Sequence, residues 1–273
     1  RFADGTLHEA VRAAGGRITH LAKMWNYAAG VHHHRPRRPR HGLSLVPPPS
    51  ALWVNFRGER IRPPLVTGFD TRALVAAVCA QGRQYSWQIL NRRIGLKELA
   101  VSGAEFNPAV REKRFLAFLR DTLFGNRWLV DELCAHCPDV VVAPTLAELV
   151  ERMNRLQRDD AVRLETLERG LRDYDERVRR RATAEDDQVA RIVTLRQYRG
   201  SKVRTCNLQP ILEPKAGPLI AIREFIISRK SLGGMQTDLA SRVLDQSGAA
   251  IPGLYAAGEA AGFGGGGMHG LRA

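Results

Sequence analysis

Apolar and polar positions follow a helical period through the middle of the chain. Apolar residues recur three and four positions apart in 71–81, 110–137, 145–156, 160–182 and 185–198, with charged residues between them. This spacing predicts amphipathic helices. Thr145 opens a capping-box sequence, and Gly125 divides 110–137 into two predicted helices. A shorter helix is expected over 6–14, ended by Gly15 and Gly16.

Short apolar runs predict strands before, within and after this helical region. They occupy 51–56, 85–90, 139–143, 218–227, 242–245 and 254–257, and several are rich in β-branched or aromatic residues. Residues 57–60 read as a tight turn, and the proline-rich and arginine-rich stretch 35–49 as a loop or extended segment. The pattern changes from helical to β-rich within 206–217, so a domain boundary is expected there.

Composition narrows the class of protein. The chain has 273 residues, of which 44% are hydrophobic, and a net charge of +14. Most of the basic residues are arginines spread along the chain with acidic neighbours, and only 32–41, HHHRPRRPRH, concentrates them. We therefore expect a basic enzyme surface and no nucleic-acid partner, with a nucleic-acid-binding or scaffold protein as the alternative.

The cysteine content and the hydropathy argue against a disulfide-rich protein and a membrane-spanning protein. Four cysteines are too few for a disulfide scaffold of this size and fit a reducing cytoplasm. Cys134 and Cys137 form a C-x-x-C without a second ligand pair, so we expect a helix end stopped by Pro138 and no metal site. No run of eighteen apolar residues occurs, and no membrane span is expected.

The two ends indicate a piece of a longer chain. The sequence begins with Arg1, without a signal-like pattern, and ends three residues after Gly270. Glycine-rich turns usually lead into another element, so both ends are expected to be internal to a longer natural chain.

The segment 251–270, IPGLYAAGEAAGFGGGGMHG, carries the most specific chemistry. Small side chains at 254–257 predict a strand that another backbone or a flat ligand can approach, and Gly258 ends it. Glu259 follows, where its carboxylate can accept two hydroxyl hydrogen bonds from a ribose or ribitol. The glycines at 264–267 lack Cβ atoms and can pass close to phosphates or a ring system.

Three sequence blocks resemble the fumarate reductase/succinate dehydrogenase flavoproteins, a family that includes ketosteroid dehydrogenase-like enzymes. I-P-G-L-Y-A-A-G-E at 251–259, followed by glycines and H-G, is similar to the C-terminal signature. S-L-G-G-M-Q-T-D at 231–238 resembles T-M-G-G-x-x-x-D, and N-F-R-G-E-R at 55–60 resembles the N-x-x-G-x-R that opens the cap. The blocks occur in the family's order across about 200 residues.

The resemblance implies an α+β architecture: a helical substrate cap domain with part of an FAD-binding α/β domain. Residues 1–50 would end the first part of the FAD-binding domain, 51–206 would form the cap, and 207–273 would return to the FAD-binding domain. The implied activity is an FAD-dependent dehydrogenase or reductase that transfers hydride between FAD and a C–C bond beside a carbonyl or carboxylate. A small-molecule substrate and an unidentified electron partner are implied, and the isolated piece is expected to be inactive.

Six positions are implied to lie near the cofactor. The family's glutamate of the A-G-E block contacts FAD, and here it is Glu259. Gly258 and the run Gly265, Gly266 and Gly267 would be its neighbours. Lys230 would line the flavin face, either with its side chain or only with its backbone.

The substrate-binding positions depart from the fumarate reductase pattern. Arg229 and Lys230 stand where fumarate reductases have two histidines, which argues against fumarate but still suits an anionic or carbonyl substrate. In H-G-L-R at 269–272 the arginine is one residue closer than in the family's H-G-x-x-R. Arg272 is a candidate substrate clamp and catalytic residue, and His269 is either a substrate ligand or a structural loop histidine.

Arg93 and Tyr198 complete the candidates for proton transfer. Arg93 follows Tyr85 at the spacing of the arginine that donates a proton in fumarate reductases, although surface ion pairing would also explain it. Arginine acts as an acid only when a relay reprotonates it, since its pKa exceeds about 12. Pro64 stands where the relay's glutamate is expected. Tyr198 is the alternative, because ketosteroid dehydrogenases use tyrosines as acid and base. Tyr255, within the strand, is expected to pack.

Overall fold

The computed structural model describes residues 5–37, 39–65 and 70–263. The chain divides into two compact units, a smaller one formed by Arg1–Asn26 with Ser228–Ala273 and a larger one formed by Tyr27–Ile227. The strands β2 (Met24–His32) and β8 (Leu219–Ser231) each have residues in both units.

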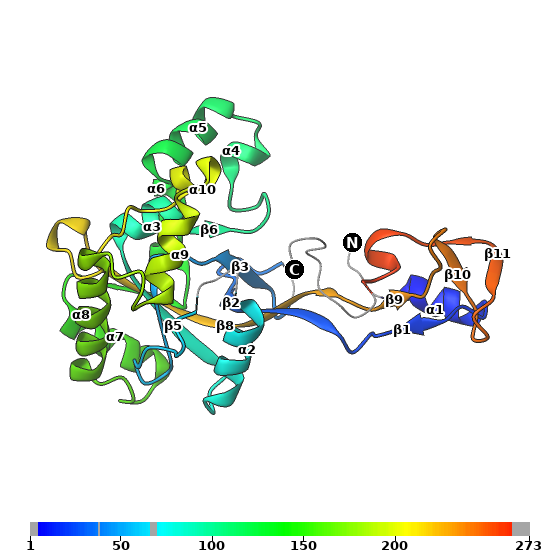
Figure 1. The fold of residues 1–273 in the computed structure, drawn as a ribbon, viewed down its shortest axis with the longest axis horizontal. Helices are drawn as coiled ribbons and strands as arrows, with labels where there is room; N and C mark the ends of the chain where they lie inside the picture. Colours follow the sequence, from blue (N-terminus) through cyan, green and yellow to red (C-terminus); the bar gives the residue numbers. More distant parts are fainter. Residues whose placement is uncertain (1–4, 38, 66–69, 264–273) are drawn as a thin grey trace. The chain divides into compact units, whose positions relative to one another are not determined.

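A seven-stranded sheet organises the larger unit (Figure 1). Its strand order is β4-β5-β8-β2-β3-β6, and β7 also pairs with β8. β5 and β8 are antiparallel, with Tyr85 opposite Phe225 and Asn91 opposite Leu219. The remaining strands are β3 (Gly42–Val46), β4 (Leu52–Val54), β5 (Tyr85–Asn91), β6 (Ala100–Val101) and β7 (Val140–Ala143).

Helices cover the two faces of this sheet unequally. On one face, Trp53 and Ile226 pack with Leu74 and Val78 of α2. On the other face a larger core joins the sheet to the remaining helices. The helices are α2 (Thr71–Ala80), α3 (Arg92–Glu98), α4 (Pro108–Arg111), α5 (Phe115–Phe124), α6 (Arg127–His136), α7 (Leu146–Gln157), α8 (Leu164–Arg180), α9 (Asp187–Leu195) and α10 (Arg199–Arg204).

Most helices with local signals form where the sequence predicts them. Thr145 Oγ1 accepts a hydrogen bond from the Glu148 backbone N–H at 3.3 Å, so Thr145 caps the start of α7 as predicted. Gly125 has φ +97°, and a Cβ there would lie 2.7 Å from the Leu96 carbonyl oxygen, which explains the break after α5. The stretch predicted as two helices holds three, because α4 forms a short additional turn before α5. The helices α3 and α10 were not predicted, and neither were the strands β1 (Ile18–Thr19), β2, β6 and β9 (Gly234–Met235).

The smaller unit is built from short elements around a small core. The paired strands are β1 (Ile18–Thr19) with β9 (Gly234–Met235), and β10 (Arg242–Leu244) with β11 (Ala250–Tyr255). α1 (Thr6–Ala13) and the 3₁₀ helix η2 (Gly258–Ala260) complete it. Its buried residues are Val11, Met235, Val243 and Ala256. Tyr255, expected to pack, is 63% exposed.

The two compact units separate at 26/27 and 227/228. The boundaries of the FAD-binding and cap domains, expected at 50/51 and 206/207, stay predictions. The segments 27–50 and 207–227 group with the larger unit because they supply β2, β3 and β8 of its sheet. Within the described residues, no helix has both the length and the hydropathy of a membrane span.

Candidate functional site

The A-G-E turn lies directly against the L-G-G-M block in the smaller unit. A Cβ on Gly234 would lie 2.4 Å from the Ala260 carbonyl oxygen, and a Cβ on Gly262 would lie 2.5 Å from the carbonyl carbon of Gly233. The Phe263 backbone N–H donates to the Leu232 carbonyl at 2.9 Å. Only glycine allows backbones to approach so closely, so these positions fix the turn onto β9.

Glu259 projects from this fixed turn. It lies in the middle of η2, its side chain is exposed, and no hydrogen bond joins its carboxylate to another described residue. Gly258 precedes it with φ +64°, a conformation that favours glycine. A carboxylate held on a rigid backbone with both oxygens available is suited to accepting hydroxyl hydrogen bonds.

A polar cavity begins immediately after the turn. It has a volume of about 710 Å³, within the range of ligand sites. The Oε1 atom of Gln236 in its wall is buried and has no hydrogen-bond partner among the residues that the structure describes. Its lining consists of Arg17, Ile18, Thr19, His20, Gln236, Thr237, Gln246, Ala261 and Gly262. An orphaned amide oxygen, a cation and several hydroxyl or amide groups fit the polar portion of a dinucleotide cofactor.

Arg93 and Tyr198 lie on different elements of the larger unit. Arg93, in the first turn of α3, is exposed and donates to Gln209 Oε1 at 3.1 Å and to the Lys215 carbonyl at 2.8 Å. Those bonds tie α3 to the chain before β8. Tyr198 is the N-cap residue of α10 and is 65% exposed. A cavity of about 470 Å³ in the same unit is lined by neither residue.

The remaining predicted positions are only partly described. Arg229 and Lys230 belong to β8, but their side chains lie outside the described part of the structure. Gly265, Gly266, Gly267, His269 and Arg272 also fall outside the described residues.

The basic block makes internal ion pairs. Arg35 pairs with Glu132 at 3.2 Å, and Arg37 pairs with Glu105 at 2.8 Å. Two of its cations therefore face carboxylates of the same protein, and no finding supports the nucleic-acid alternative.

The C-x-x-C behaves as the end of a helix. α6 ends at His136, one residue before Cys137. Burial raises the pKa of Cys134 to about 11 and that of Cys137 to about 12. These thiols are protonated at neutral pH and lack the thiolate that redox chemistry needs.

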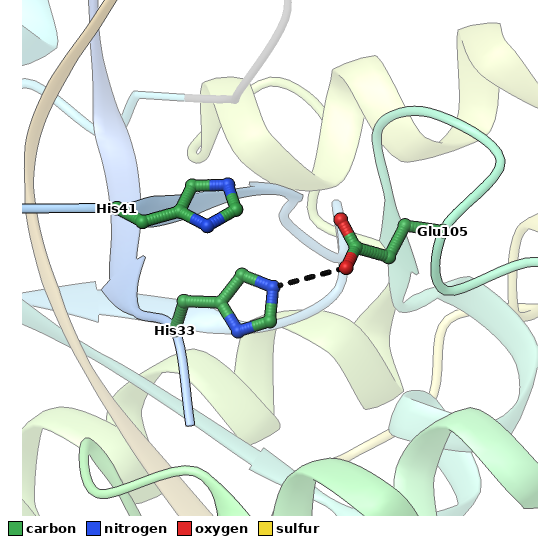
Figure 2. A group of neighbouring side chains, drawn as sticks. All are labelled: His33, His41 and Glu105. Carbon is green, nitrogen blue, oxygen red and sulfur yellow. Dashed lines mark hydrogen bonds and ion pairs between the residues drawn. The ribbon is translucent and has the colours of Figure 1, made fainter. Parts of the chain in front are cut away.

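One group of side chains could not be predicted from the sequence. His33, His41 and Glu105 lie together in the larger unit (Figure 2). The two histidines face each other because β2 pairs with β3. The sequence of β2 does not alternate clearly between apolar and polar residues, so this pairing was not predictable.

Comparison with known proteins places the chain in a flavoprotein family. The sequence model of the FAD binding domain family matches residues 1–273. The chain belongs to this family, and its cofactor is FAD. Glu259 and the polar cavity beside it fit such a group.

Two similar proteins are named as KsdD-like steroid dehydrogenases. The chain is 40% identical over 272 residues to a "KsdD-like steroid dehydrogenase" of Mycolicibacterium smegmatis, covering 98% of this chain and 49% of that protein. It is 39% identical to a KsdD-like steroid dehydrogenase of Mycobacterium tuberculosis, covering 99% of this chain and 48% of that protein. The chain thus spans about half the length of the curated relatives it matches.

A solved structure shares the fold. It is the crystal structure of 3-ketosteroid delta1-dehydrogenase from Sterolibacterium denitrificans in complex with 1,4-androstadiene-3,17-dione. The TM-score is 0.56 at 18% identity, and the match covers 96% of this chain and 42% of that chain.

Proposed function

We propose that this chain is part of an FAD-dependent dehydrogenase that acts on a C–C bond beside a ketone, with a 3-ketosteroid as the substrate class. The observation that carries the proposal is the exposed Glu259 carboxylate on a turn fixed by Gly233, Gly234 and Gly262. The steroid substrate is suggested by the 40% identical relative, which is described as a steroid dehydrogenase.

We assign the smaller unit to the cofactor and the helical part of the larger unit to the substrate cap. Glu259 would accept hydrogen bonds from FAD hydroxyls, with Gly258 and the run 265–267 passing close to the cofactor. The cavity wall from Arg17 to His20 would surround a polar part of the same group. Lys230, Arg229 and His269 would lie toward the flavin face and the substrate.

When bound, FAD supplies a hydride acceptor or donor. The chain's own residues would handle the proton and the charge that develops on the ketone oxygen. Tyr198 can exchange a proton through its hydroxyl, and its exposed ring leaves the oxygen accessible. Arg93 and Arg272 can stabilise negative charge with paired N–H donors. The four cysteines, all free thiols, suit the reducing cytoplasm proposed as its location.

Anaerobic mixing of the full-length protein with a saturated 3-ketosteroid tests the reaction. The proposal predicts loss of the oxidised flavin absorbance and formation of a steroid with one more C=C bond beside the carbonyl. Flavin that stays oxidised with ketosteroids but becomes reduced with succinate would assign the enzyme to carboxylate chemistry. Flavin unaffected by both would contradict the proposed reaction class.

The isolated chain is expected to be inactive and colourless. The sequence has G-x-G-x-x-G matches at 262–267 and 265–270, but they fall in the glycine run after the A-G-E block, and we do not assign them to the usual grip on the cofactor's pyrophosphate. A purified fragment that keeps a flavin absorption band through gel filtration would show that the cofactor site is misplaced.

A further inference from the structure

The hairpin formed by β2 and β3 places two histidines face to face. His32 is opposite Gly42 in the register of the two strands, so His33 and His41 form the next opposed pair. The His33 backbone N–H donates to the His41 carbonyl at 3.2 Å. Opposed residues of an antiparallel pair project to the same side, and the two imidazole rings lie 4.4 Å apart between centroids.

A carboxylate from another part of the unit completes the group. β6 pairs with β3 through Val101 and Leu45, and the chain after β6 carries Glu105 to the histidines. Its neighbour Phe106 is buried and packs edge-on against the His33 ring at 5.4 Å. Glu105 Oε1 lies 3.4 Å from His33 Nε2, and Figure 2 shows both rings pointing toward this carboxylate.

These three side chains form a donor set that divalent transition metals prefer. One ligand atom from each of His33, His41 and Glu105 lies within 4.8 Å of the others. Two imidazoles and a carboxylate bind Zn²⁺ in open sites, where water takes the fourth position. Metal–ligand distances of about 2.0–2.2 Å require the three groups to close inward, and the exposed hairpin that carries His41 allows this movement.

His33 is the buried member of this group, with a side chain that is 1% exposed.

Two sets of contacts compete with the metal. The backbone N–H of Arg35 donates to His33 Nδ1 at 2.9 Å, and that of Arg37 donates to His41 Nδ1 at 3.2 Å. Neutral rings with acceptor Nδ1 atoms carry their proton on Nε2. A metal at Nε2 shifts this proton to Nδ1, so the backbone amides of Arg35 and Arg37 lose their acceptors and have to find new partners.

The second competing contact is weak. Arg37 donates to Glu105 at 2.8 Å, but its side chain is 72% exposed. Surface ion pairs of this kind are weak, whereas Zn²⁺ held by several protein side chains is bound strongly. A cation at the carboxylate can therefore displace the guanidinium.

We propose that His33, His41 and Glu105 bind one divalent transition-metal ion, with Zn²⁺ as the best match. The bound ion would link the end of β2 to the start of β3. The site belongs to the larger unit and is independent of the flavin chemistry proposed above.

Zn²⁺ titration of the full-length protein tests this proposal. Chelator-treated protein at pH 7 is titrated calorimetrically, and the bound zinc is counted after dialysis. We expect wild-type protein to bind one more zinc than either variant, H41Q or E105Q, at this site, and each variant to weaken its binding at least about tenfold. The matched control E112Q changes an exposed carboxylate elsewhere in the same unit and should bind zinc as the wild type does.

A second readout distinguishes the site from a general loss of structure. Zinc should increase hydrogen exchange of the backbone amides of Arg35 and Arg37, because their histidine acceptors are lost. The variants should keep the wild-type melting temperature without zinc.

Three results would overturn the proposal. They are equal zinc binding by wild type, H41Q and E105Q; no zinc bound by the wild type above the buffer background; or a zinc site abolished by H136Q. The last would move the metal to the neighbouring contacts of Glu132 with His34 and His136, at 3.0 and 3.8 Å.

Discussion

Glu224 makes the stability of this protein depend on pH in a way that one substitution can isolate. The residue lies in β8 opposite Ser86 and is 0% exposed. Neither carboxylate oxygen has a hydrogen-bond partner among the described residues. Burial alone raises the pKa of Glu224 well above its ordinary value of 4.5. The folded protein therefore keeps this proton after the unfolded chain has released it.

The sign and size of the effect follow from proton linkage. Between the unfolded and folded pKa values the folded state binds one proton more, so stability falls as pH rises, by about 1.4 kcal/mol per pH unit. E224Q keeps the shape of the side chain and removes its ionisable proton. Relative to wild type, the variant should gain up to about 2.7 kcal/mol between pH 5 and pH 7.

Thermal melting of full-length wild-type protein and E224Q from pH 5 to pH 7.5 measures this difference. A gain of about 2–3 kcal/mol corresponds to several degrees in Tm for a protein of this size. The variant's advantage should grow with pH.

E98Q is the matched control. Glu98 is also buried, but it accepts hydrogen bonds from the Ser50 N–H, the Ser50 hydroxyl and the Cys206 N–H. An amide at position 98 would place its N–H₂ group against these donors, so E98Q should lower the stability of the protein at pH 5. At the same pH, E224Q should leave the stability almost unchanged. A melting difference between wild type and E224Q that does not change with pH would refute the reasoning, since it would mean that the Glu224 pKa is not raised.

Three further predictions concern separate parts of the chain. R60M should cost up to about 3 kcal/mol of unfolding free energy, since it removes the nearest cation of the buried Asp186, at 2.6 Å, and leaves only Arg177 at 3.5 Å. A denaturation curve measures the loss, and a loss no larger than that of R155A, which breaks an exposed pair with Glu151, would contradict it. G170A changes an open position inside α8 and should stabilise the protein by up to about 1 kcal/mol. G234A should destabilise the protein and release flavin, because its Cβ would meet the Ala260 carbonyl. Equal Tm shifts in the two variants would argue against the close approach of Gly234 to Ala260. Y198F and R93K should lower kcat with flavin occupancy and Tm unchanged, and full activity in both variants would remove these residues from the site.

The helices were predictable from local sequence signals, whereas the order of strands in the sheet depends on pairing between distant segments and was not predictable. Thr145 marks the start of a helix through a hydrogen bond that acts within four residues, and Gly125 marks the end of a helix through its own positive φ. Both boundaries were predicted and are confirmed. β2 contains small and polar residues without alternation, so only its neighbours in the sheet define it. The burial of Glu224 likewise depends on what packs over β8, and nothing in its local sequence indicates it.

The candidate site shows the same division. The L-G-G-M and A-G-E blocks could be found from the resemblance, but the reason for their glycines appears only where Gly234 meets Ala260. His33 and His41 were visible as part of a basic stretch. Their grouping with Glu105 depends on the pairing of β3 with both β2 and β6, which joins residues about 70 positions apart.

The FAD affinity of E259Q in the full-length protein tests the central claim most directly. Equilibrium dialysis or flavin fluorescence gives the Kd of wild type, E259Q and the control E9Q, which changes an exposed carboxylate of α1 in the same unit. Loss of a charge-assisted hydrogen bond of about 1–3 kcal/mol predicts that E259Q binds FAD roughly 5- to 150-fold more weakly, while E9Q binds it as the wild type does. An unchanged Kd for E259Q would contradict the assignment of this turn to the cofactor.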